Sequence, residues 1–263
     1  MNKGITYRNL GEIFVIEIEN KNIEVGTIEG LSKKYYPEPF NKYVVIKNIY
    51  KYPEKVKEYA LDCQFTNHMN IVGGAPVIRT YAPMSNVIQE VVNPALCDSF
   101  NREVFARRGG TDCAIFSYYD PEVIKYHQYH EPHMDVESWR PLYPSLPQDF
   151  SLAETRGKNI AGVIFLDETF GTEILVNKDM SYYYSERSGL WGTPPWAGTN
   201  NNYYPEGNDS HYEHKITIGG EYNSAVFYYS DLVHRPYYLG ASDKDFKDGR
   251  LIQNIWFDDM TQE

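Results

Sequence analysis

Cysteine is scarce in this sequence. Among its 263 residues there are only three, Cys63, Cys97 and Cys113. Because they are odd in number and widely spaced, they fit neither a disulfide framework nor the paired spacing of a zinc cluster. We therefore expect reduced core thiols in an intracellular protein, with a cytoplasmic location.

Long apolar runs and basic patches are also missing. No stretch approaches the ~18 consecutive apolar residues of a membrane-spanning helix, and the charged N-terminal segment does not read as a signal peptide. The formal net charge is −11, and Arg107 and Arg108 are the only adjacent arginines. An acidic surface repels polyanions, so we expect no nucleic-acid partner and no membrane association.

Hydrophobic and aromatic residues are plentiful by comparison. Hydrophobic residues make up 42% of the chain, which excludes wholesale disorder and provides for a sizeable core. The 24 tyrosines are typical of pleated sheets, on which aromatic side chains pack well. A sugar- or peptide-binding surface is the other interpretation, and composition leaves both open.

The first hundred residues combine strands and helices. The alternating FVIEIE (14–19) and the β-branched YVVIKNIY (43–50) predict strands. Proline is tolerated in a first helical turn, so Pro53 with the apolar spacing that follows predicts a helix over 53–63. A second helix is expected over 84–97. We interpret residues 1–110 as an N-terminal strand and helix elaboration packed on the core.

From residue 111 onward the sequence predicts strands. Short runs rich in β-branched and aromatic residues alternate with Gly, Pro, Asn and Asp clusters. These runs are CAIFSYYD, NIAGVIFLDE, TEILVN, HKITIGG, NSAVFYYSDLVH and RLIQNIWFDD. We expect an α+β, mainly β protein whose core at 111–263 is a sandwich or barrel with jelly-roll connections.

Two long segments lack strand or helix patterns. Residues 140–150 are proline-rich, and residues 189–211 combine Gly, Pro and Asn with aromatic residues such as Trp191 and Trp196. Structureless loops of this length are uncommon unless they are functional or disordered. We expect them at the rim of a site, with 189–211 either a substrate lid or an aromatic-rich surface loop.

The stretch HEPHMD (130–135) is the strongest candidate for a metal site. A helical arrangement of its histidines is disfavoured because Pro132 restricts Glu131 and removes a backbone donor. The zinc-protease pattern HExxH also fails, since Met134 stands where the second histidine is needed. On an extended strand, however, His133 and Asp135 project from the same face and can ligate one ion.

A third ligand must come from elsewhere, and His234 at the end of NSAVFYYSDLVH is the natural candidate. Two histidines and one carboxylate on one face of an octahedral metal leave three positions open, as in non-haem Fe(II) oxygenases. The pattern H-x-D followed by a distant histidine is weak when it stands alone.

Arg250 strengthens this interpretation. It opens RLIQNIWF, and a hairpin could return it to the mouth of the barrel beside His234. Its planar fork suits a dicarboxylic acid whose other end chelates the metal. A surface ion pair with Asp245 or Asp248 is the alternative. Strand parity places four residues on one half-polar face: Arg250, Ile252, Asn254 and Trp256.

Taken together, the segments resemble the 2-oxoglutarate- and Fe(II)-dependent oxygenase superfamily, most closely its prolyl 4-hydroxylase-like branch. HEPHMD resembles a tyrosine-x-proline-His-x-Asp segment, with His130 where tyrosine often stands. NIAGVIFLDETFGTE resembles the next strand and glycine turn, although Gly171 stands alone where two glycines are usual. SAVFYYSDLVH and RLIQNIWF resemble the strands of the second histidine and the oxoglutarate-binding arginine.

The resemblance covers roughly residues 111–258, and YVVIKNIYKYPEKVKEYAL resembles the start of a poorly characterised phage and bacterial subgroup. It implies a double-stranded β-helix in which His133, Asp135 and His234 hold Fe(II).

The resemblance also implies the cosubstrates. 2-Oxoglutarate would chelate the metal and reach Arg250 with its far carboxylate, helped by Tyr118 or Tyr126, and O2 would be the oxidant. The implied reaction is hydroxylation of a C–H bond in an amino-acid side chain, a peptide or a small metabolite.

Two alternatives stay open. One is a metal-dependent cupin-type oxygenase that does not use 2-oxoglutarate, and the other is a jelly-roll binding or structural module with a vestigial metal site. The substrate would be a small molecule or a peptidyl group, and a homodimer is left open.

Overall fold

A computed structural model describes residues 7–31, 33, 36–65, 77–83, 85–106, 114–119, 159–168, 171–177, 212–230, 232–236 and 250–259. Its helices are α1 (Tyr7–Ile13), α2 (Pro53–Asp62) and α3 (Ser85–Phe100), with a short 3-10 helix η1 (Asn20–Asn22). Its strands are β1 (Ile23–Thr27), β2 (Lys42–Lys47), β3 (Val77–Tyr81), β4 (Val104–Ala106), β5 (Ala114–Tyr119), β6 (Asn159–Phe165), β7 (Thr172–Asn177), β8 (Tyr212–Ile218), β9 (Ser224–Tyr229), β10 (Val233–Pro236) and β11 (Arg250–Asp259). None of the helices in these ranges is both long and apolar enough to cross a membrane.

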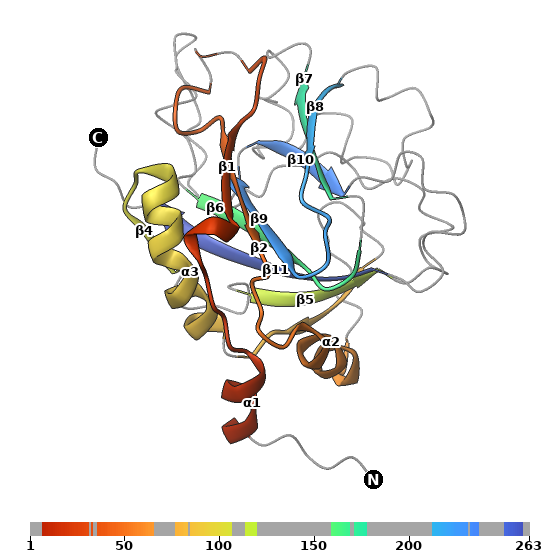
Figure 1. The fold of residues 1–263 in the computed structure, drawn as a ribbon. Coiled ribbons are helices and arrows are strands. Elements are labelled where there is room, and N and C mark those ends of the chain that lie inside the picture. Colours follow the sequence, from red (N-terminus) through yellow and green to blue (C-terminus); the bar gives the residue numbers. More distant parts are fainter. Residues whose placement is uncertain are drawn as a thin grey trace, which may run out of the picture.

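The strands form two antiparallel sheets. The large sheet has the order β1-β2-β9-β6-β11-β5-β3, with β4 also paired to β11, and the small sheet has the order β10-β7-β8. Figure 1 shows the small sheet above the large one, with α1 and α2 below it.

This strand order is that of a double-stranded β-helix, which confirms the predicted fold. The hairpin β7–β8 lies in the small sheet, and the strands that flank it, β6 and β9, pair with each other in the large sheet. Moving outward along the chain, β10 returns to β7, and β11 pairs with both β6 and β5. One long hairpin rolled over itself gives this nested pattern, the basis of jelly-roll folds.

Two hydrophobic cores lie on the two faces of the large sheet. The inner core fills the space between the sheets and includes Val163, Tyr228 and Ile252 from the large sheet and Ile174 and Ile218 from the small one. We call the face of the large sheet that lines this space the inner face. The other core lies on the outer face, which the helices cover.

The outer core joins the two halves of the sequence. It contains Val56 of α2 and Ile88 of α3 together with Phe116, Ile160 and Leu251 of the later strands. The strands β1, β2 and β3 extend both edges of the large sheet. Strands of the N-terminal part are therefore continuous with the large sheet, and residue 110 lies outside the described residues.

Most predicted elements are present, but FVIEIE is not a strand. Phe14 is buried, and Ile16 and Ile18 pack against the same outer core, so the alternating pattern does reflect burial. Both edges of β2 are already taken by β1 and β9. The segment is left with one isolated bridge, between Ile16 and Tyr50.

NSAVFYYSDLVH is two strands rather than one. The amide of Leu232 donates to the carbonyl of Tyr229 at 3.0 Å, a turn that ends β9 and takes the chain from the large sheet to the small one. His234 therefore belongs to the small sheet and Arg250 to the large one. Within the described residues β10 and β11 are not paired with each other, contrary to the expected hairpin.

Gly171 marks the entry to the small sheet, just before β7. Its φ is +91°, and a Cβ there would lie 2.6 Å from the carbonyl oxygen of Ile218. Both observations favour glycine, because other residues rarely adopt positive φ. A single glycine is sufficient for this turn.

Two of the three cysteines are described. Cys63 and Cys97 are free thiols and half-buried, and Cys97 Sγ lies 3.4 Å from both the amide nitrogen and the carbonyl oxygen of Val104. Cys113 lies outside the described residues.

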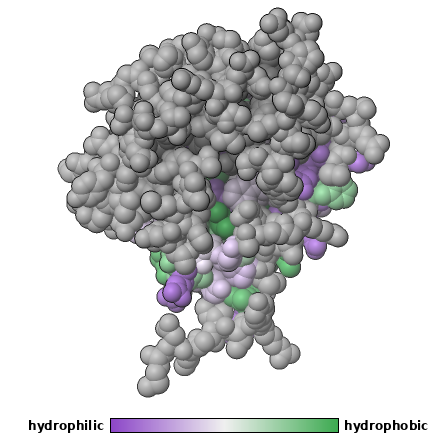
Figure 2. Space-filling model, turned by 180° about the vertical axis from the view of Figure 1, so that it is seen from behind, coloured by the Kyte–Doolittle hydropathy of each residue, from purple (hydrophilic) through white to green (hydrophobic). Residues whose placement is uncertain are grey.

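On the face shown in Figure 2, hydrophobic side chains of the described residues form small separate patches among hydrophilic ones.

Candidate functional site between the two sheets

His234 points into the space between the sheets. It lies directly opposite Ile174 in the β10–β7 pair, and its side chain is buried. Its ring packs edge-on against Tyr228 of the inner core, with 4.9 Å between ring centroids. The sequence proposed this histidine as a ligand at the end of NSAVFYYSDLVH, and the structure places it in the short strand β10.

A backbone contact orients the ring of His234. Its Nδ1 lies 2.9 Å from the carbonyl oxygen of Leu232. Because a carbonyl can only accept, Nδ1 donates in this contact, and Nε2 is the ring nitrogen that could ligate a metal. This arrangement, with one ring nitrogen held by a backbone carbonyl, is typical of histidines that ligate a metal through the other nitrogen.

An ion pair stabilises the strand of His234 from the other face. Arg235 lies opposite Glu173 in the register, and its Nε donates to Glu173 Oε2 at 2.6 Å. Their side chains are only 7% and 1% exposed. A slip of one residue would turn every side chain of β10 to the opposite face and break this pair, so the pair keeps His234 inward.

Arg250 also faces the inner core. It is the first residue of β11 and only 2% exposed, and its guanidinium carbon lies 5.7 Å from the centroid of the Phe165 ring. A side chain this buried does not lie at the surface, and Asp245 and Asp248, the alternative partners of Arg250, lie outside the described residues.

The sheet register gives the spacing of the residue rows that His234 and Arg250 contact. On the inner face, directly opposed residues form three successive rows, Tyr228–Ala161–Trp256, Val226–Val163–Asn254 and Phe165–Ile252. Rows lie two residues apart, or about 7 Å, so the first and third are about 14 Å apart. His234 contacts the first row and Arg250 contacts the third.

The row between them is partly polar. Ser117 is fully buried, and its hydroxyl donates to Asn254 Oδ1 at 2.8 Å. Asn254 and Trp256 are half-buried, in contrast to the buried Gln253 and Ile255 on the outer face. The predicted half-polar face of β11 is confirmed, and Ser117 adds a group that sequence reasoning missed. The one feature of the sequence that could have indicated Ser117 is the presence of a hydroxyl residue within the apolar run CAIFSYYD.

Tyr118 does not belong to this site. In the register it lies opposite Leu251, not Arg250, and it packs against the outer core with its ring 6.1 Å from that of Phe65. Neighbouring residues of a strand project to opposite faces. The prediction that Tyr118 assists Arg250 is therefore wrong.

The other predicted site residues, His133, Asp135 and Tyr126, lie outside the described residues, as do segments 140–150 and 189–211. Within the ranges that are described, no three His, Cys, Asp or Glu side chains cluster closely enough to hold a metal. His214, the other described histidine, is exposed on β8 and lies 3.0 Å from Thr217 Oγ1.

Comparison with known proteins gives structural similarity only. No family model matches the chain, and no curated protein matches its sequence. Similar solved structures include the non-haem α-ketoglutarate-dependent epimerase SnoN of nogalamycin biosynthesis, at 10% identity and a TM-score of 0.45 over 88% of this chain and 83% of that one. The carbocyclase SnoK of the same biosynthesis has 12% identity and a TM-score of 0.42 over 89% and 86%. A prolyl-4-hydroxylase from Pseudomonas putida has 9% identity and a TM-score of 0.37 over 96% of each chain.

Proposed function

We propose that this protein is an Fe(II)- and 2-oxoglutarate-dependent dioxygenase that hydroxylates a C–H bond of an amino-acid side chain, a peptide or a small metabolite. One observation carries the proposal. A buried histidine, whose Nδ1 is held by a backbone carbonyl, and a buried arginine face the same space between the sheets of a double-stranded β-helix.

The proposed metal ligands are His133, Asp135 and His234. The strands of the rolled hairpin pair as β5–β11, β6–β9 and β7–β8. Within the described residues β10 pairs only with β7, which leaves a place for one more strand beside β10. The chain that connects β5 to β6 contains residues 133 and 135. We propose that His133 and Asp135 of this connection complete the metal site with His234.

The proposed ligand of Arg250 is the far carboxylate of 2-oxoglutarate. A guanidinium fork binds a carboxylate through two parallel hydrogen bonds. The ~14 Å between the row at His234 and the row at Arg250 leaves length for a metal ion and a short dicarboxylic acid in line. Tyr126 is the proposed additional donor, now that Tyr118 faces the outer core.

Fe(II) with 2-oxoglutarate and O2 would supply the oxidising chemistry. The chain's own part is to bind, orient and exclude water. The backbone contact at Leu232 holds the His234 ring, Arg250 orients the dicarboxylate, and Val163 and Ile252 line the wall of the space between them. An apolar wall of this kind limits the access of bulk water to the reacting groups.

Ligand binding tests the proposal before any substrate is known. Anaerobic Fe(II) plus 2-oxoglutarate should give a weak visible charge-transfer band. His234→Ala should remove the band, Arg250→Ala should weaken 2-oxoglutarate binding, and the exposed His214→Ala is the matched control that should change neither. Metal binding indifferent to His234, or oxoglutarate binding indifferent to Arg250, would contradict the proposal. Succinate formation with candidate substrates then tests the hydroxylase reaction itself.

A further inference from the structure

The start of β11 is held by a carboxylate from the end of β6. Asp167 Oδ2 accepts a hydrogen bond from the backbone amide of Leu251 at 2.7 Å, directly after Arg250. The carbonyl of Leu251 accepts from the amide of Leu166 at 3.1 Å. Both backbone polar groups of Leu251 are thus bound by two consecutive residues of one turn.

The side chain of Asp167 binds the backbone of β11 just beyond the last residue pair of β6 and β11. The last register pair of β6 and β11 at this end is Phe165 with Ile252. One residue further along β11, the amide of Leu251 receives a carboxylate oxygen in place of a strand carbonyl. A hydrogen bond to an ionised acceptor is roughly twice as strong as one between neutral groups. The start of β11 is therefore held on the β6 side by the carboxylate of Asp167.

Lys57 connects this carboxylate to the N-terminal part of the chain. Its Nζ donates to Asp167 Oδ1, so the two oxygens of Asp167 serve α2 and β11 separately. The side chains of Lys57 and Asp167 are 34% and 18% exposed. Since the ion pair is partly solvated, we attribute to it orientation of the carboxylate rather than a large stabilising energy.

We propose that Asp167, oriented by Lys57, is a positioning residue for Arg250 and so determines selectivity for a dicarboxylic 2-oxo acid over a monocarboxylic one. The proposal rests on the proposed function, in which Arg250 binds the far carboxylate. The backbone of Arg250 is paired on its other side with Tyr119 of β5, so loss of the Asp167 contact releases the strand start on one side only. A displacement of about 1 Å is enough to weaken a bidentate contact many-fold.

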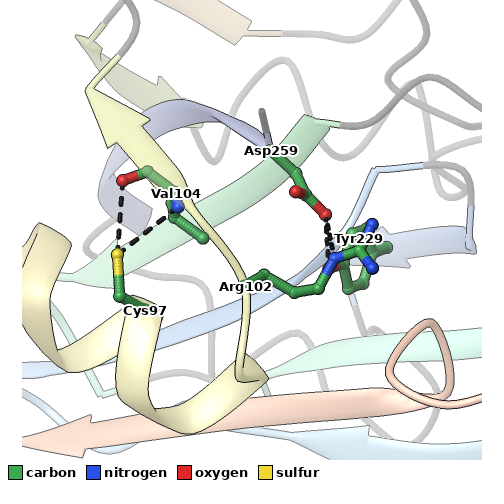
Figure 3. Close-up of polar contacts among 5 residues, drawn as sticks. All are labelled: Cys97, Arg102, Val104, Tyr229 and Asp259. Carbon is green, nitrogen blue, oxygen red and sulfur yellow. Dashed lines mark hydrogen bonds and ion pairs between the residues drawn. The ribbon is translucent and has the colours of Figure 1, made fainter. Parts of the chain in front are cut away.

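The opposite end of β11 provides a matched control. Asp259 Oδ2 accepts from Arg102 Nε and from the hydroxyl of Tyr229, each at 2.9 Å, as Figure 3 shows. It is likewise an aspartate that ties β11 to the preceding part of the chain, but it lies nine residues from Arg250. A variant there loosens the same strand without touching its start.

The experiment compares two ligands on the full-length protein loaded with Mn(II). 2-Oxoglutarate and 2-oxopentanoate have the same carbon chain, but only the first carries the carboxylate for Arg250. Their dissociation constants are measured by calorimetry for the wild type, Asp167→Ala, Lys57→Gln and Asp259→Asn. Circular dichroism establishes that each variant is folded, and Asp167→Asn replaces Asp167→Ala should the latter be unfolded.

We expect Asp167→Ala to weaken 2-oxoglutarate binding about tenfold and to leave 2-oxopentanoate within about twofold. Lys57→Gln should give a smaller change of the same kind, and Asp259→Asn should leave the ratio of the two constants unchanged. An unchanged ratio in both position-167 variants overturns the positioning role, as does an equal change in Asp259→Asn. A wild type that does not prefer 2-oxoglutarate overturns the proposed function, and the positioning role with it.

Discussion

The contacts of Asp259 with Arg102 and Tyr229, at the end of β11, allow a stability prediction that is worked from the structure. The side chain of Asp259 is fully buried and that of Arg102 is 11% exposed. The two are joined at 2.9 Å, and the hydroxyl of Tyr229 donates to the same carboxylate oxygen. Removing one partner of a buried ion pair costs about 3–5 kcal/mol, because the remaining charge stays away from water.

The guanidinium of Arg102 has a second favourable contact, which lowers this figure. Its central carbon lies 5.6 Å from the centroid of the Phe40 ring, a cation–π arrangement worth about 0.5–2 kcal/mol that survives the loss of the carboxylate. We therefore expect Asp259→Ala to lower the free energy of unfolding by about 3 kcal/mol. The double variant Asp259→Leu with Arg102→Met should regain most of it, since apolar replacement of a buried pair is often nearly neutral.

Urea unfolding followed by tryptophan fluorescence measures both variants. The expected change is in the midpoint, with an unaltered slope, because the folded surface stays the same. A cost below about 1 kcal/mol for Asp259→Ala would refute the reasoning, since that is the value of a solvated surface pair. A double variant less stable than Asp259→Ala would refute the claim that unpaired charge causes the loss.

Three further predictions concern substitutions of single residues. Burial raises the pKa of Tyr50 above its usual 10.0. The neutral phenol therefore stabilises the fold fully below about pH 10, and this contribution is lost at higher pH because the unfolded chain ionises first. Tyr50→Phe should flatten the decline of the unfolding free energy above that pH. Gly171→Ala should cost about 1–3 kcal/mol in chemical denaturation because its φ is positive, whereas Gly11→Ala, with nothing within 4 Å of its added Cβ, should cost none. Glu173→Ala should cost about 3 kcal/mol by removing the carboxylate that pairs with the buried Arg235, and Mn(II) titration should show weaker metal binding.

Local pattern predicted most of the strands and helices correctly. Pro53 followed by apolar residues at helical spacing gave α2, and the apolar run NIAGVIF gave β6, because side-chain periodicity reports which faces are buried. The alternation in β11 placed Arg250 and Asn254 on one face before any partner strand was known. The candidate ligand His234 and the candidate carboxylate-binding Arg250 were also evident from the chain itself.

Sheet membership was not evident, because it depends on which strand edges are available. FVIEIE has the pattern of a strand but among the described residues makes one isolated bridge, Ile16 with Tyr50, since β1 and β9 already occupy both edges of β2. The turn after Tyr229 divides an apolar run that reads as continuous and carries His234 to the other sheet. The face of Tyr118 was not evident either, because its parity relative to Arg250 depends on the register between β5 and β11.

The sequence by itself determined which segments are apolar on one side, which are helical, and which residue types could bind a metal and a dicarboxylate. Only the tertiary structure decided that His234 and Arg250 both face the inner core, and that Asp167 and Glu173 bind the neighbouring residues Leu251 and Arg235. The physical reason is that periodicity is a property of neighbouring residues, whereas these contacts join residues 62 to 84 positions apart.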